Sequence, residues 1–176
     1  MSGSDEIRES IRPLLQLSRD TIVRLQKTEY ALVSSLQRDP VLAERVKRLR
    51  TVPGVGPIAA LTWALEIGDV TRFRSVKQAI SYCGLCGDEK SSADKVIRTP
   101  LSKQRNKHIQ RALEEAAKVA PRQSHELALV REKELQKGNA NRATLAVARK
   151  MVAYLLAVDR EQREFVPAEE RSSSAA

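Results

Sequence analysis

The chain contains 176 residues, of which 41% are hydrophobic, yet its aromatic residues are only one Trp, three Tyr and two Phe. A core of Leu, Val, Ile and Ala favours a mainly α fold over an all-β one, and no apolar run of about 18 residues or signal segment indicates a membrane or secreted protein. The formal net charge of +9 points to nucleic acid as a partner in the cytoplasm, because such a charge repels itself without a polyanion.

The first predicted element is a long helix over residues 5–37, a stretch with one Pro and no Gly. Its apolar residues recur at alternating spacings of three and four, but Ser and Thr occupy several seam positions. This diluted heptad pattern leaves two interpretations open: a helix that packs on its own domain, or an arm through which the chain forms homo-oligomers. We assign residues 1–38 to a long, coiled-coil-like helical arm.

A second helical pattern follows, with Asp39 as the N-cap and Pro40 at the first helical position. The motif TVPGVGP (51–57) separates it from a helix predicted over residues 58–66. Two helices around a Gly-x-Gly turn are typical of a helix-hairpin-helix element, in which the glycines let backbone amides approach a phosphate. The candidate contacts are Gly54, Val55 and Gly56. The alternative is a tight turn between packed helices.

The next helix is predicted to start at a capping box formed by Ser75 and Gln78 and to end at Gly84. It runs into the pair Cys83 and Cys86, which could serve redox chemistry, bind zinc or be two reduced structural thiols. A thioredoxin-type site has its helix after the pair instead of before it, and the chain's two histidines fit no common zinc spacing. We expect structural thiols and no metal site.

A polar loop with a short extended hairpin over residues 94–99 is expected next, and then a basic helix capped by Ser102. Cations at a helix start oppose the macrodipole unless an anion lies there, so this helix predicts an anionic ligand. The residues expected to contact nucleic acid in this region are Lys95, Arg98, Lys103, Arg105, Lys107, His108 and Arg111.

The C-terminal part of the chain is predicted to be helical again, over residues 124–137 and 141–161, with a break at Gly138. These helices complete a compact helical domain over residues 39–162. The remainder, residues 163–176, has the composition of a flexible tail.

Four blocks of the sequence carry a family resemblance: LRTVPGVGPIAALTWALEIGDVTRFRSVKQAISYCGL, SS, SKQRNKHIQRALEEAA and AVARKMVAYLLAV. In this order, from Leu49 to Val158, they resemble the C-terminal domain of the IS110/IS116 insertion-sequence transposase family. The resemblance implies a DNA recombinase with a composite active site. In such an enzyme a RuvC-like domain supplies acidic ligands for Mg²⁺, the C-terminal domain supplies a serine nucleophile, and a structured guide RNA selects the DNA. No cofactor is expected in the present chain.

The family's Ser-Gly pair maps best onto Ser92, with Ser91 as the adjacent alternative. Attack by this serine would give a 5'-phosphoserine intermediate that preserves phosphodiester energy for rejoining. The chain departs from the family pattern at Ala93 and Arg105, where glycine is usual. Since no block resembles the RuvC-like half, we expect an excised domain or a short relative that has lost cleavage, inactive alone. Two other functions stay open: a non-catalytic helix-hairpin-helix DNA-binding protein, and a redox module built on the cysteine pair.

Overall fold

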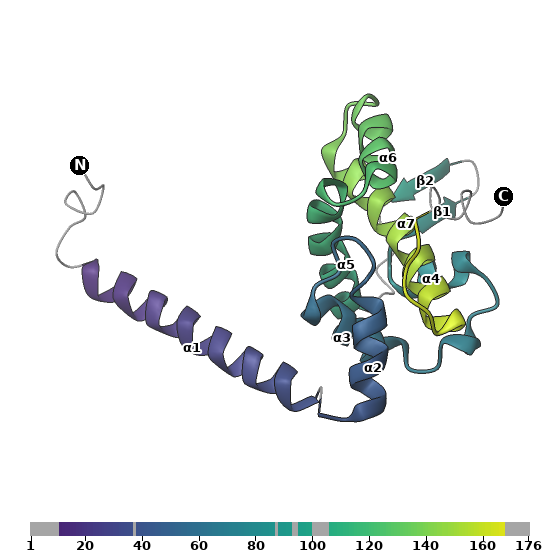
Figure 1. Ribbon diagram of the computed structural model, residues 1–176. Helices are drawn as coiled ribbons and strands as arrows, with labels where there is room; N and C mark the ends of the chain where they lie inside the picture. The colour runs from purple at the N-terminus through teal and green to yellow at the C-terminus, as the bar shows by residue number, and fades with distance from the viewer. Residues whose placement is uncertain (1–10, 37, 87, 93–94, 100–105, 168–176) are drawn as a thin grey trace. The chain divides into compact units, whose positions relative to one another are not determined.

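The computed structural model describes residues 11–36, 38–86, 88–92, 95–99 and 106–167. The chain divides into two compact units, Met1–Asp39 and Pro40–Ala176 (Figure 1). Helices dominate both units, so the expected mainly α fold is confirmed. Within the described ranges, no helix is long and apolar enough to cross a membrane.

The described part of the first unit is one helix, α1 (Arg12–Leu36), which lies within the range predicted for it. None of its side chains is buried. Large apolar side chains stay exposed, among them Leu25 at 63% and Leu32 at 59%. The hydroxyls of Thr21 and Thr28 donate to carbonyls one turn back at 2.7 and 3.0 Å. The helix therefore presents an apolar stripe in which two polar interruptions, Thr21 and Thr28, bond to its own backbone.

The second unit combines helices with one small β-hairpin. In chain order its helical elements are α2 (Pro40–Leu49), α3 (Pro57–Ile67), η1 (Val70–Arg72), α4 (Val76–Tyr82), α5 (Lys107–Val119), η2 (Ala120–Arg122), α6 (His125–Leu135) and α7 (Ala140–Glu161). The hairpin lies between α4 and α5 in the chain and consists of β1 (Asp88–Ser92) and β2 (Lys95–Thr99). The helices predicted after the Gly-x-Gly turn and in the C-terminal part are confirmed to within two residues at each end.

The core of the second unit is organised around α7, which packs against α2, α4, α5 and α6 (Figure 1). Residues of α7 at helical spacing are at most 3% exposed, namely Ala143, Val147, Met151, Leu155 and Val158. This is the pattern of a helix with one face in a core, and each large aliphatic side chain buried in this way contributes about 1.5–3 kcal/mol. The central helix thus fixes the positions of the elements that carry the candidate site.

Helix starts follow the capping signals in the sequence. Ser75 Oγ accepts a hydrogen bond from the N–H of Gln78 at 3.3 Å, and Gln78 Oε1 accepts one from the N–H of Arg74 at 2.8 Å. The predicted capping box therefore forms, with its return bond made one residue earlier than in the usual arrangement. At the start of α7, Asn139 Oδ1 accepts from the N–H of Arg142 at 3.0 Å.

The segment after α7 turns back onto the helices. The sequence assigns residues 163–176 to a flexible tail, but the backbone N–H of Phe165 donates to Thr51 Oγ1 at 2.8 Å. The ring of Phe165 also lies against the ring of Tyr154, with the centroids 4.7 Å apart. The packed part of the chain therefore extends past the predicted boundary.

Candidate nucleic-acid interface

The two candidate serines lie at the end of β1, on the β-hairpin. The strands are antiparallel, and the register pairs Ser92 with Lys95 and Ser91 with Val96. Paired positions share one face of such a ribbon, whereas neighbouring positions along a strand alternate between faces. The positions of Ser92, Lys95 and Lys90 therefore share one face, and the position of Ser91 belongs to the other.

The same register separates two of the predicted nucleic-acid contacts. Arg98 is paired with Glu89, and this pair shares the face of Ser91. The positions of Lys95 and Arg98 therefore lie on opposite faces of the ribbon. In the backbone register, the position opposite Arg98 is Glu89, and the position opposite Lys95 is Ser92.

The chain that leads into the hairpin is anchored to α5 and α7. Gln110 Nε2 donates to the carbonyl of Gly84 at 3.4 Å, and Arg149 Nε donates to the carbonyl of Leu85 at 2.7 Å. Gln110 is only 6% exposed, so its position is set by the packing of α5. The hairpin starts from a point that two packed helices hold in place.

The basic helix starts later than the sequence predicts. Asn106 is the N-cap of α5, because its Oδ1 accepts from the N–H groups of His108 at 3.0 Å and Ile109 at 3.2 Å. The expected cap at Ser102 is therefore wrong. Ser102 itself lies outside the described residues.

This later start changes the electrostatics expected for α5. Lys107, His108 and Arg111 are exposed in its first turns, whereas Lys103 and Arg105 lie outside the described residues. Of the described residues, Lys107 and Arg111 place cations in the first turns of α5, where positive charge opposes the macrodipole.

Glu66, at the end of α3, is an internal anion that the sequence does not reveal. Asn106 Nδ2 donates to its carboxylate, which places a negative charge beside the start of α5, where the macrodipole favours one. The backbone carbonyl of Glu66 accepts hydrogen bonds from Tyr82 Oη at 2.9 Å and from Arg72 Nη2 at 3.4 Å. Because Glu66 and Asn106 are 40 residues apart, no local pattern signals this contact.

Arg72 is a further exposed cation that the predictions omit. Its guanidinium carbon lies 4.7 Å from the ring centroid of Phe73 and 4.3 Å from that of Tyr82, a geometry in which the ring faces attract the cation. Arg72 donates to the backbone carbonyl of Glu66, and the carboxylate of Glu66 accepts from Asn106, the residue before Lys107. Arg72 of η1 and the N-cap Asn106 of α5 are therefore both bonded to Glu66 at the end of α3.

Two residues of the Gly-x-Gly turn, Gly54 and Val55, take part in packing. Gly54 has φ +80°, and a Cβ there would lie 2.6 Å from Ala120 Cβ, so only glycine lets the turn approach the end of α5. The N–H of Gly54 already donates to Gln123 Oε1 at 2.7 Å. Val55 is buried, and its N–H donates to the carbonyl of Val52 at 3.0 Å. Of the three predicted phosphate contacts, Gly54 is half-buried, Val55 is buried and Gly56 is exposed.

The cysteine pair has the character of structural thiols. Cys83 is fully buried, and Cys86 is partly exposed. Burial raises the pKa of Cys83 to about 12, which keeps this thiol protonated near neutral pH and removes the thiolate that redox exchange needs. In the described part of the chain, no group of three or more His, Cys, Asp or Glu residues could hold a metal ion.

Comparison with known proteins identifies the family. A family model described as Transposase IS116/IS110/IS902 family matches residues 46–131, the stretch that contains the Gly-x-Gly turn, the serine hairpin and α5. The chain belongs to this transposase family. The resemblance drawn from the sequence blocks is thereby confirmed, and membership supports a transposase-related function.

Two curated relatives of this chain carry transposase names. Transposase y4qE of Sinorhizobium fredii is 34% identical over 95 residues, which cover 54% of this chain and 24% of the relative. The transposase for insertion sequence element IS1111A of Coxiella burnetii is 24% identical over 153 residues, which cover 85% of this chain and 40% of the relative. The chain thus spans less than half the length of either relative.

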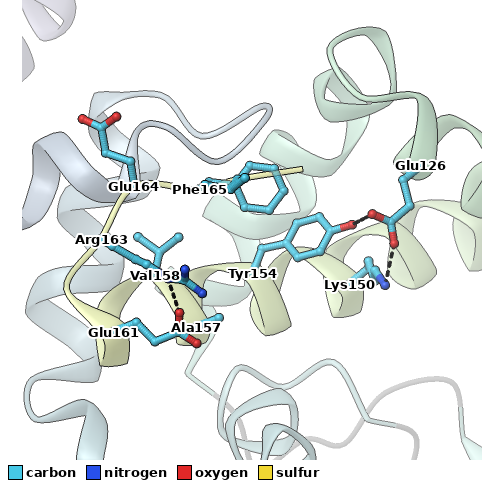
Figure 2. A pocket seen from close by; sticks show the side chains of 10 residues that line it. Glu126, Lys150, Tyr154, Ala157, Val158, Glu161, Arg163, Glu164 and Phe165 are labelled. Carbon is cyan, nitrogen blue, oxygen red and sulfur yellow. Dashed lines mark hydrogen bonds and ion pairs between the residues drawn. The ribbon is translucent and has the colours of Figure 1, made fainter. Parts of the chain in front are cut away.

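A pocket of about 200 Å³ lies elsewhere in the chain, between α6, α7 and the segment after α7. Figure 2 shows Tyr154 donating its hydroxyl to Glu126, whose other oxygen accepts from Lys150 Nζ at 2.7 Å, with Phe165 beside the Tyr154 ring. None of the sequence-predicted site residues lines this pocket. Its polar groups bind one another, so it gives no support to the predicted chemistry.

Proposed function

We propose that this chain is the nucleic-acid-binding, serine-bearing part of a DNA transposase. The observation that carries the proposal is the hairpin register, in which Ser92 is paired with Lys95 and shares a face with Lys90. A hydroxyl between two cationic positions is suited to attack a phosphate, because the cations offset the charge that develops on the phosphate oxygens. The position of Ser91 is paired with Val96 instead, so Ser92 is the preferred nucleophile.

In the proposed reaction, Ser92 Oγ attacks the phosphorus of a DNA phosphodiester. A new Oγ–P bond forms, the bond from phosphorus to the 3' oxygen breaks, and the serine proton leaves while the departing oxygen gains one. The product is a 5'-phosphoserine and a free 3'-hydroxyl, from which the reverse attack can rejoin a strand. Acidic residues of a RuvC-like domain would hold Mg²⁺ in a complete enzyme, and we assign no cofactor to this chain.

The nucleic acid would be held by exposed polar and cationic side chains near the start of α5. Lys107, His108 and Arg111 lie there, and Arg72 joins them at Glu66. The net charge of +9 supports a polyanionic partner. DNA is the partner that family membership suggests, and a structured guide RNA would bind through the same phosphate chemistry.

The first unit would provide self-association. The exposed Leu25 and Leu32 of α1 are seven residues apart, the spacing of a heptad seam. Because Ser and Thr interrupt the seam, the homo-oligomer that we propose is a weak one.

The serine assignment is tested in a recombinase that joins this chain to a RuvC-like domain. Ser92→Ala should abolish strand exchange and covalent trapping of DNA, but leave DNA affinity within about twofold, because the hydroxyl is the nucleophile and carries no charge. Ser91→Ala is the matched control and should exchange strands at the normal rate. If Ser91→Ala were instead the inactive variant, the alignment would be wrong by one residue. If both variants were active, neither serine would be the nucleophile, and this chain would contribute nucleic-acid binding only.

A further inference from the structure

A second group of cations surrounds a groove at the opposite end of α5. The groove lies between η2 and α6, has a volume of about 400 Å³ and is lined by Lys118, Arg122 and Arg131. All three side chains belong to exposed residues. Pro121 and Leu135 contribute apolar lining. Three cations from separate elements thus converge on a concave surface with an apolar base.

The carboxylates near this groove do not neutralise it. Glu132 is the acidic residue of the lining, and Lys118 Nζ is bonded at 2.7 Å to Glu115. Neither Arg122 nor Arg131 forms an ion pair with any residue that the structure describes. Converging like charges repel one another, so the arrangement favours an anionic ligand.

Helix stabilisation accounts for only part of this arrangement. Lys118 lies in the last turn of α5, where a cation interacts favourably with the macrodipole. Arg131 lies seven residues into α6, beyond the reach of either helix end. Its position beside Lys118 and Arg122 therefore needs another explanation.

We infer that this groove, formed by Lys118, Arg122 and Arg131, is a second binding site for the backbone of a duplex nucleic acid. Phosphates would contact the three cations, and a sugar would lie on Pro121 and Leu135, since a nucleic-acid backbone alternates charged and less polar groups. This inference rests on the proposed nucleic-acid function and adds a site that neither the serine hairpin nor the start of α5 supplies.

The geometry of α5 allows one duplex to contact both basic regions. Lys107, Arg111 and Lys118 are spaced by four and seven residues, so they project from one face of the helix. At a rise of 1.5 Å per residue, Lys107 and Lys118 are separated by about 16 Å along the axis, which corresponds to about five base pairs of duplex. Glu114 and Glu115 lie between them, so the cations form two clusters instead of one stripe.

The test compares two variants of the full chain with equal net charge. The groove variant carries Lys118→Gln, Arg122→Gln and Arg131→Gln. The control carries Lys133→Gln, Lys137→Gln and Arg142→Gln, which are exposed cations outside the groove. Affinity for DNA and RNA duplexes of about 20 base pairs is measured between about 50 and 200 mM salt. Circular dichroism is used to check that both variants are folded.

Loss of three phosphate contacts should flatten the plot of log affinity against log salt by about two to three units. Over this salt range, three phosphate contacts account for a fall in affinity of about 40-fold. The affinity of the groove variant should lack this part of the fall. The control variant should reduce the slope of this plot by less than about one unit. The single substitution Arg131→Gln should reduce it by about one unit. Flattening with the DNA probe assigns the site to DNA, and flattening with the RNA probe alone assigns it to RNA.

Three results would overturn the inference. The first is an equal effect of the groove variant and the control, which would reflect net charge only. The second is an unchanged slope in the groove variant with both probes. The third is an unchanged slope together with binding of a Glu decapeptide that only the groove variant loses, which would make the groove a site for an acidic peptide.

Failure of the inference can be separated from failure of the proposed function. If the unaltered chain binds neither duplex, the proposed function fails. If it binds, and Lys107→Gln with Arg111→Gln flattens the plot while the groove variant does not, the proposed function stands and the second site is wrong.

Discussion

Arg45 and Asp159, 114 residues apart in the chain, form a two-point ion pair that joins α2 to the end of α7. Arg45 Nε donates to Oδ1 at 2.8 Å, and Nη2 donates to Oδ2 at 2.6 Å. Trp63 Nε1 donates to Oδ2 at 3.0 Å, so the carboxylate also binds α3. Asp159 is only 8% exposed, and three donors compensate for the burial of its charge.

Asp159→Asn is expected to lower the free energy of unfolding by about 2–4 kcal/mol, because it leaves the partly buried Arg45 without its counter-charge. The control is Glu44→Gln, which makes the same chemical change in the exposed pair with Arg48 and should have an effect below about 1 kcal/mol. Urea unfolding measures both. Equal losses would show that Asp159 has no special structural role.

Gly54→Ala is expected to destabilise the protein by about 2–4 kcal/mol. The positive φ disfavours any side chain, and the added Cβ would meet Ala120 Cβ at 2.6 Å. Gly56→Ala is the matched control, since no atom lies within 4 Å of its Cβ position, and it should have an effect below about 1 kcal/mol. A Gly54→Ala variant of normal stability and lower DNA affinity would restore the phosphate-contact interpretation of this turn.

Asn106→Asp tests whether the contact with Glu66 sets the start of α5. Asp is normally as good an N-cap as Asn, but its carboxylate cannot donate to Glu66 near neutral pH. The variant should therefore lose about 1–3 kcal/mol of stability. Adding Glu66→Gln supplies a donor on the other side and should recover most of the loss. Full stability of Asn106→Asp alone would mean that the cap acts without Glu66.

The two cysteines should differ in reactivity. With a pKa of about 12, buried Cys83 carries almost no thiolate near pH 8, whereas Cys86 is partly exposed. Iodoacetamide should therefore modify Cys86 in the folded protein and Cys83 only after unfolding, as followed by mass spectrometry. Equal rates of modification, or a reversible disulfide between the two, would support the redox interpretation instead.

Leu25→Gln with Leu32→Gln should abolish the concentration-dependent self-association proposed for α1, because both residues lie on its seam. The control variant, Val23→Gln with Tyr30→Gln, removes exposed apolar side chains from other positions of the same helix and should associate normally. Sedimentation at increasing concentration measures both. A strict monomer before any substitution would contradict the proposal.

The sequence predicts the elements that local chemistry determines. The Ser75–Gln78 capping box and the helices of the second unit follow from spacing, caps and breaks in the chain, and the structure contains them. The start of α5 does not follow in this way. Ser102 and Asn106 are both suitable caps, and the bond from Asn106 to Glu66, made across 40 residues, was not accessible to a local pattern.

Long-range contacts also explain why the candidate site was only partly predictable. Gly54 could be recognised as a turn glycine, but its approach to Ala120 depends on how α5 packs. Arg72, Arg122 and Arg131 are ordinary surface cations in the sequence. Their significance comes from the neighbours that folding brings to them, the aromatic rings of Phe73 and Tyr82 or the groove beside α6.

The alternation of faces in the hairpin limits how this loop can change during evolution. Deleting or inserting one residue within β1 would exchange the faces of Ser91 and Ser92, since a shift of one position moves every residue to the other side of a ribbon. A change of two residues would restore the original face. Length changes between the anchored Leu85 and the serine pair should therefore accumulate in even numbers among relatives that keep the same nucleophile, and odd-numbered changes should accompany a switch to the neighbouring serine.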